Sequence, residues 1–298
     1  MSPRDRITAV LITITLVVSS FAIGSAPRWA ACLTAALCLT TVIPLVRSRR
    51  YMSKPPMLLL LLLLMIGATI IQLIPLPSGV VAFISPQRWE LVSEHAAAWG
   101  KEPPGWLTFS YDYPGTLVEL AKLVGYLAFA YACLWLSGSS RGRRWILSSI
   151  AMVGGAMALT AIAHHLASAK KLYGLYQPNF PAPSYMAPLL NPNQFAALLA
   201  FATAVSIGLA VSSSATRRAT WIGVGLLCAG VAFLTQSRAG AISLGVGAAV
   251  AGWLIWRQKR GVAEEEESGL PRHVMVPAII IMSCILALLV AFTAGWVA

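Results

Sequence analysis

Charged side chains are scarce in this 298-residue sequence, where only 11% of the residues are Asp, Glu, Lys or Arg. An ordinary soluble domain carries about 25%. Apolar residues make up 58% of the chain and the mean hydropathy is +0.74, so a soluble protein is excluded and lipid is the expected surrounding. The net charge of +12 does not indicate a nucleic-acid partner, because most basic residues stand in short clusters between long apolar runs.

Cysteines and acidic residues are also few. The cysteines all lie inside apolar runs, without any CxxC spacing: Cys32, Cys38, Cys133, Cys228 and Cys284. This placement excludes a disulfide framework and a zinc site, and we expect neither a metal nor a cofactor. The ten acids all fall in loops or at a helix edge. Ion-coupled transporters carry ionisable residues in mid-membrane, so ion coupling is disfavoured.

Long apolar runs dominate the remainder of the chain. A helix needs about 20 apolar residues to cross a hydrocarbon core of about 30 Å. Nine runs approach this length, at residues 7–24, 29–46, 57–76, 117–137, 145–167, 193–212, 220–235, 240–256 and 274–297. We therefore predict an all-α polytopic membrane protein with about nine transmembrane helices, in a single integral membrane domain over residues 1–298. The first run is followed at once by the second, which favours a retained span over a cleaved signal peptide.

The basic residues predict the orientation of these spans. If the N-terminus is cytoplasmic, 15 of the 22 lysines and arginines fall on the cytoplasmic side. The positive-inside rule then places the C-terminus outside, together with two long segments at 77–116 and 168–192. In the first segment, Ser85 and the apolar spacing after it predict a short amphipathic helix on the membrane face.

Local helix signals add three expectations. Thr116 and Glu119 have the spacing of a capping box for the fourth span, and Asn191 followed by Pro192 is typical of an Asn-capped helix start. Residues 220–256 would form a single helix of about 55 Å, nearly twice the core thickness. We therefore predict two shorter helices that are joined at residues 236–239.

Arg238 lies in this predicted turn and has no acidic neighbour in the sequence. A guanidinium at the tip of a partly immersed hairpin needs a counter-charge. A lipid phosphate or pyrophosphate would supply one in bidentate fashion. The alternative is an arginine that extends to bulk lipid headgroups, as interfacial arginines do.

His164 and His165 are adjacent near the outer end of the fifth span. Neighbouring side chains on a helix point about 100° apart, and no Asp, Glu or Cys stands three or four residues away. An interfacial, non-catalytic role is therefore favoured over a metal site. The Tyr- and Asn-rich segment 168–192 suits sugar contacts, and equally suits a polar loop with interfacial tyrosines.

Three short motifs resemble one known superfamily. They are Gly174-Leu175-Tyr176, Asn191-Pro192-Asn193-Gln194-Phe195-Ala196, and Leu234-Thr235-Gln236-Ser237-Arg238-Ala239-Gly240. Together they resemble the O-antigen ligase and O-antigen polymerase superfamily. The segments 72–77 and 110–122 are similar to its first large external loop, so the resemblance covers nearly the whole chain.

The resemblance implies a metal-independent glycosyltransferase of the bacterial inner membrane that takes part in polysaccharide or lipopolysaccharide synthesis. Such proteins transfer a glycan from an undecaprenyl-pyrophosphate carrier to an acceptor at the periplasmic face. The acceptor is lipid A core in ligases, another glycan in polymerases and a protein in oligosaccharyltransferases. Membrane lipids are the expected surroundings, and nucleic acid is not an expected partner. Only Arg238 corresponds to a family functional position, in a turn implied to bind the donor phosphates.

The sequence departs from this family in one large respect. Ligase-type members have about twelve spans, and a loop after the ninth supplies a catalytic histidine. This sequence reaches Ala298 where that loop would begin. We therefore expect the N-terminal portion of the fold, without the catalytic loop and the last spans, and assign no catalytic residue. Two alternatives stay open: a flippase or transporter of lipid-linked glycan, and a non-catalytic membrane partner of a polysaccharide assembly complex.

Overall fold

The computed structural model describes residues 1–46, 56–177 and 186–263. Within these ranges the chain forms ten α-helices and a single pair of two-residue strands, which confirms an all-α architecture. The chain divides into two compact units, one of Met1–Thr15 with Ser25–Ser139 and one of Leu16–Gly24 with Ser140–Ala298. The expected single domain over residues 1–298 stays a prediction.

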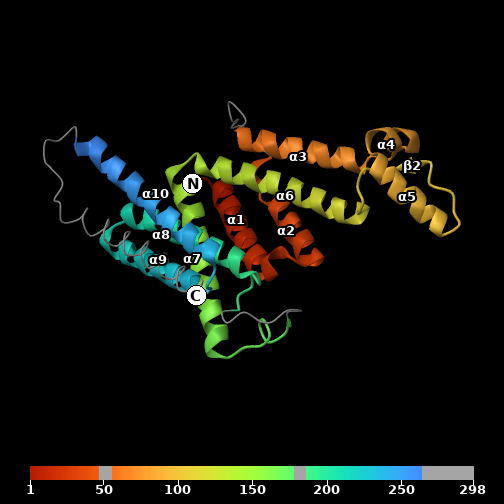
Figure 1. Cartoon of the computed structure of the whole chain (residues 1–298). Coiled ribbons are helices and arrows are strands. Elements are labelled where there is room, and N and C mark those ends of the chain that lie inside the picture. The colour runs from red at the N-terminus through yellow and green to blue at the C-terminus, as the bar shows by residue number, and fades with distance from the viewer. Residues whose placement is uncertain (47–55, 178–185, 264–298) are drawn as a thin grey trace. The chain divides into compact units, whose positions relative to one another are not determined.

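The first unit is built around one long helix, α6 (Tyr113–Ser137), which packs against α2 (Arg28–Thr40) and α3 (Met57–Leu73) (Figure 1). The unit also contains the start of α1 (Pro3–Phe21) and a short 3-10 turn, η2 (Ile43–Leu45). Gly125 allows α6 to approach α2 closely, because a Cβ at this position would lie 3.0 Å from the Cα of Ala35.

The segment between α3 and α6 is ordered and gathers at one end of these two helices (Figure 1). It contains β1 (Leu76–Pro77), α4 (Ser78–Ile84), α5 (Pro86–Ala98) and β2 (Trp106–Leu107), with β1 and β2 antiparallel. The helix that was predicted after Ser85 is α5; the sequence did not predict α4.

Arg88 of α5 connects this helix to the stretch that precedes α6. Its Nη2 donates to the carbonyl of Ser110 at 2.8 Å, and its guanidinium lies 4.3 Å from the ring centre of Tyr111. The amide of Ser110 in turn donates to the carbonyl of Gln72 at 3.0 Å. The two segments that resemble the family's first external loop are therefore joined by a backbone hydrogen bond.

The start of α6 differs from the prediction. Asp112 is the N-cap, and its carboxylate accepts from the amide of Gly115 at 3.0 Å. Thr116 lies inside the helix, where its hydroxyl bonds that of Ser110, and Glu119 pairs with Lys122. The expected capping box is wrong because a stronger cap stands four residues earlier, with proline in the first helical turn.

The second unit is a bundle of α7 (Ser140–Leu166), α8 (Pro192–Val211), α9 (Ala215–Leu234) and α10 (Arg238–Ala263). Helix α8 contacts the other three (Figure 1). Its Phe195 and Leu199 are almost fully buried, together with Met157 of α7 and Val231 of α9. The end of α1 and the 3-10 turn η1 (Ile23–Ser25) also contribute to this unit, up to Gly24.

Five segments within the described ranges are long and apolar enough to cross a membrane: Arg28–Leu45, Tyr113–Ser137, Ser140–Leu166, Pro192–Val211 and Ala215–Leu234. The chain is therefore a membrane protein. Helix α3 is apolar but has only 17 residues, α10 contains the eighth predicted span, and the ninth at 274–297 lies outside the described residues. A total of nine spans stays a prediction.

The basic cluster before the fifth predicted span lies on a helix and not in a loop. Only Gly138 and Ser139 separate α6 from α7, so Arg141, Arg143 and Arg144 fall within the first turns of α7. This helix of 27 residues is about 40 Å long, which carries the cluster beyond a hydrocarbon core of about 30 Å.

Candidate functional site

The chain reverses between α9 and α10 in a three-residue turn. Helix α9 ends at Leu234 and α10 begins at Arg238, which confirms two helices over residues 220–256. The hydroxyl of Thr235 donates to the carbonyl of Ala232 at 2.7 Å, and the amide of Ser237 donates to this hydroxyl at 3.3 Å. Gln236 adopts a left-handed conformation with φ of 56°, and this conformation turns the chain back.

Ser237 joins the starts of two helices. Its hydroxyl oxygen accepts from the amide of Gly240 at 3.0 Å, so Ser237 caps α10. The same hydroxyl donates to Oδ1 of Asn193 at 2.7 Å. Asn193 lies in the first turn of α8, where its own amide donates to the capping side chain of Asn191 at 2.9 Å. Two motifs that are 44 residues apart in the sequence thus form one hydrogen-bonded junction.

Close helix packing holds this junction in place. Gly240 of α10 lies against Ala196 of α8, and a Cβ at position 240 would overlap the Cβ of Ala196. Ala196 is fully buried and Phe195 is 1% exposed. The motif that starts α8 therefore has two parts, since its asparagines form the junction and its Phe-Ala pair packs in the core.

Arg238 is exposed at the first position of α10, beside this junction. Its guanidinium forms no hydrogen bond or ion pair with any residue in the described ranges. No acidic residue occurs in the described part of the second unit, so the charge is not balanced there. A phosphate ligand as the counter-charge of Arg238 stays a prediction.

The electrostatics of the junction favour an anion. Each helix N-terminus carries about half a positive elementary charge, and α8 and α10 both begin here. The first amides of α10, those of Arg238 and Ala239, have no partner inside the helix. With the Arg238 guanidinium, these donors could hold a phosphate group by charge-assisted hydrogen bonds.

His164 has a structural role. Its Nε2 accepts from the amide of Tyr173 at 3.2 Å, which leaves Nδ1 as the donor to the carbonyl of Met186 at 3.1 Å. The Tyr173 hydroxyl donates to the carbonyl of Phe21 at 2.9 Å. His164 thus connects both described ends of the segment between α7 and α8, and both of its ring nitrogens are used.

The suggested sugar-contacting segment is described in part. Leu172 and Tyr176 form a tight turn, with the Leu172 amide donating to the Tyr176 carbonyl at 2.7 Å. Tyr176 is 38% exposed, whereas Asn179 and Tyr185 lie outside the described residues. In the described ranges no three His, Cys, Asp or Glu residues lie close enough together to hold a metal ion.

The sequence identified Arg238 by its position but did not identify Asn193 and Ser237 as partners. Both residues belong to motifs that the sequence analysis singled out. Two motifs that each place a polar residue at a helix start were the signal from which their contact could have been predicted. Comparison adds no relative on which this geometry could be superimposed. The chain matches no protein-family model, no curated protein and no solved structure.

Proposed function

We propose that this chain is part of an O-antigen ligase-like glycosyltransferase that binds the pyrophosphate of an undecaprenyl-pyrophosphate-linked glycan at the α8–α10 junction. The observation that carries the proposal is the hydrogen bond from Ser237 to Asn193. It joins two of the motifs on which the family resemblance rests, and it places Arg238 beside two helix N-termini.

The chemistry of glycan transfer suits these groups. When an acceptor hydroxyl attacks the sugar, the bond to the carrier breaks and negative charge develops on the leaving pyrophosphate. A guanidinium and helix-start amides that are already in place stabilise this charge without reorganisation. A lysine at this position would act as a point charge, whereas the guanidinium of Arg238 can engage two phosphate oxygens at once.

The proposal includes the location of the chain. We place it in a bacterial inner membrane with nine spans, the N-terminus in the cytoplasm and the C-terminus in the periplasm. In this orientation the start of α8 and the start of α10 lie at the periplasmic side. An acceptor such as lipid A core or another glycan would approach from the same side.

A binding measurement tests the proposed role of Arg238. Undecaprenyl pyrophosphate is titrated onto the purified chain in lipid nanodiscs, and the same titration is done for Arg238→Ala and Arg238→Lys. The loss of a charge-assisted contact should weaken binding roughly 10- to 150-fold in the Ala variant. The Lys variant should recover little, because it lacks bidentate geometry.

Arg217→Ala provides the matched control, because Arg217 is also exposed and also lies in the first turn of a helix, α9. It should bind as the unaltered chain does. Equal weakening by Arg217→Ala would indicate a general charge effect, and full binding by Arg238→Lys would indicate an arginine that merely extends to lipid headgroups. Either result contradicts the pyrophosphate site.

Transfer is tested separately, in membranes that contain the complete protein and the lipid-linked donor. The expected product is an acceptor that carries the glycan through a new glycosidic bond, and Arg238→Ala should abolish it at matched expression. Movement of the lipid-linked glycan across the membrane without such a bond would contradict transfer.

A further inference from the structure

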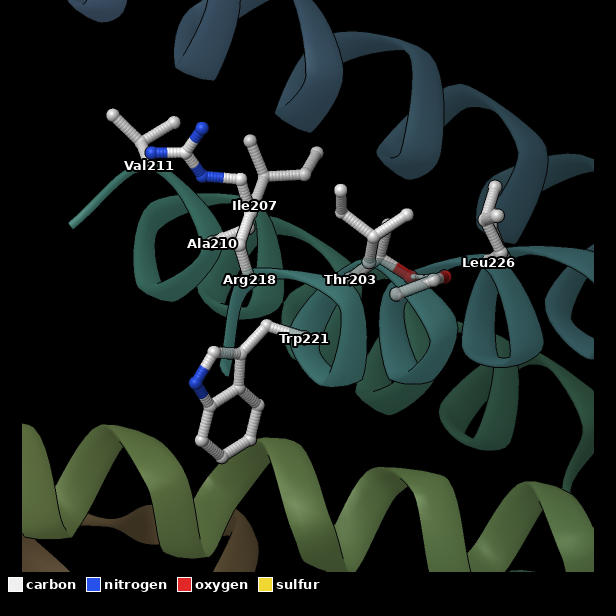
Figure 2. A pocket seen from close by; sticks show the side chains of 10 residues that line it. Thr203, Ile207, Ala210, Val211, Arg218, Trp221 and Leu226 are labelled. Atoms are coloured by element: carbon white, nitrogen blue, oxygen red, sulfur yellow. Dashed lines mark hydrogen bonds between the residues drawn. The ribbon is translucent and has the colours of Figure 1, made fainter. Parts of the chain in front are cut away.

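A pocket lies between α8 and α9 near the turn that connects them, away from the Arg238 junction. Its volume is about 500 Å³, within the range of about 300–1,000 Å³ that is usual for ligand sites. Its walls include Thr203, Ile207 and Val211 of α8 and Trp221, Ile222 and Leu226 of α9 (Figure 2).

The walls of the pocket are mostly apolar. Thr203 is the hydroxyl-bearing residue of the lining, and its Oγ1 already donates to the carbonyl of Leu199 at 2.8 Å. Both helices are long and apolar enough to span a membrane, and the apolar part of the lining belongs to these two spans. Its chemistry therefore suits an alkyl chain.

Arg218 supplies the charge in this lining. Its guanidinium lies beside Val211 and Ile207, whereas Thr203 and Leu226 are at the far end (Figure 2). One Nη donates to the carbonyl of Ser213 at 3.3 Å, which is a long hydrogen bond. The side chain is exposed, and its remaining donors can bind a ligand.

The surroundings of Arg218 are positive. Arg217 precedes it, and Arg144 of α7 donates to the Ser213 hydroxyl and to the carbonyl of Ser212. The described part of the second unit contains no acidic side chain that could neutralise these three arginines. A ligand at this end of the pocket is therefore expected to be an anion.

We propose that this pocket binds one anionic phospholipid, with an acyl chain between α8 and α9 and the headgroup phosphate on Arg218. A mostly apolar pocket between two candidate spans, with a cation at its end, matches the two parts of such a lipid. Asn193 and Val211 are 18 residues apart on α8, or about 27 Å. The lipid site is thus separate from the Arg238 junction and does not depend on the proposed glycan transfer.

The test uses native mass spectrometry of the purified chain, which is first delipidated in detergent and then titrated with phosphatidylglycerol. We expect one lipid to bind more tightly than the rest. Arg218→Gln should weaken this lipid roughly 10- to 100-fold, because it removes the charge-assisted contact with the phosphate. Ala229→Phe, which fills the pocket and leaves Arg218 and Ser213 unchanged, should weaken it as well.

Arg217→Gln is the matched control, since it removes the same charge from the neighbouring position and should leave the tight lipid in place. If Arg217→Gln weakened lipid binding as much as Arg218→Gln does, a specific anionic lipid site would be overturned. The same holds if the unaltered chain bound phosphatidylcholine as tightly as phosphatidylglycerol. Unchanged binding in Ala229→Phe would overturn the placement of the acyl chain. Equally tight binding of glycerol 3-phosphate would show a free-phosphate site and would also overturn the proposal. Size-exclusion profiles identify variants that do not fold, and Ala229→Phe keeps the test decisive if Arg218→Gln is among them.

Discussion

At the scale of single residues, His164 illustrates how a residue with catalytic chemistry can serve structure. Its two ring nitrogens bond Tyr173 and Met186, which lie at the two described ends of the segment between α7 and α8. The sequence favoured a non-catalytic role because no ligating residue stood nearby. It could not predict the two partners, since both are backbone groups whose positions depend on the fold.

The first prediction concerns this connection. His164→Phe removes both hydrogen bonds and leaves a backbone amide and a carbonyl without partners, which should cost about 1–3 kcal/mol locally. Trypsin should then cut faster at Lys170 and Lys171 than in the unaltered chain. Leu166→Phe serves as the control, because Leu166 is 79% exposed at the end of the same helix. Equal cleavage of the two variants would show that His164 does not hold the segment.

The second prediction concerns alkaline pH and Tyr173. Partial burial raises the pKa of Tyr173, which is 43% exposed, to about 12, whereas an unfolded tyrosine ionises near pH 10. The folded chain thus holds this proton more tightly, so the contribution of Tyr173 to stability is fully present below about pH 10 and is lost as the pH rises through about 12. The difference in phenolate absorbance between the unaltered chain and Tyr173→Phe should have its midpoint near pH 12. A midpoint near pH 10 would be the contrary result.

At the scale of elements, the sequence predicted a helix boundary correctly where one capping residue was available or where helix length alone required a break. Asn191 caps α8 as expected, and the length argument correctly divided residues 220–256. The start of α6 was mispredicted because Asp112 competes with Thr116 as the cap. The junction of Ser237 with Asn193 was not predictable from local signals, because it depends on how α8 and α10 pack.

The third prediction tests this packing. Gly240→Ala places a methyl group against Ala196 and should destabilise the bundle by about 1–3 kcal/mol, as overpacked cores do. It should also weaken pyrophosphate binding, since it separates Ser237 from Asn193. Gly252→Ala lies on the same helix, where a Cβ meets nothing within 4 Å, and should be neutral or slightly stabilising. Detergent-solubilised thermal unfolding compares the two, and similar melting temperatures would refute the close contact.

At the scale of the whole molecule, composition alone indicated a membrane protein, because so few charges cannot cover a surface in water. The number of spans was harder to predict, since α3 and α10 combine apolar stretches with marginal length or charged ends. The division into two units was not predicted, because hydropathy reports burial in lipid and does not report which helices contact one another.

The fourth prediction concerns orientation. Alkaline phosphatase is active only outside the cytoplasm, so a fusion after Lys171 should be active and fusions after Arg144 and Ser214 should be inactive. These sites lie at opposite ends of α7 and α8. The reverse pattern would place the Arg238 junction on the cytoplasmic face and would contradict a periplasmic transfer site.

The hydrogen bond from Ser237 to Asn193 also has a consequence for how the protein is made. Asn193 leaves the ribosome 44 residues before Ser237, a delay of about 2–9 s at about 5–20 residues per second. During this interval α8 is available for insertion while its polar start has no partner on α10. The junction can therefore form only after α9 has crossed and α10 has emerged, so a nascent chain that stalls earlier inserts helices without assembling the site.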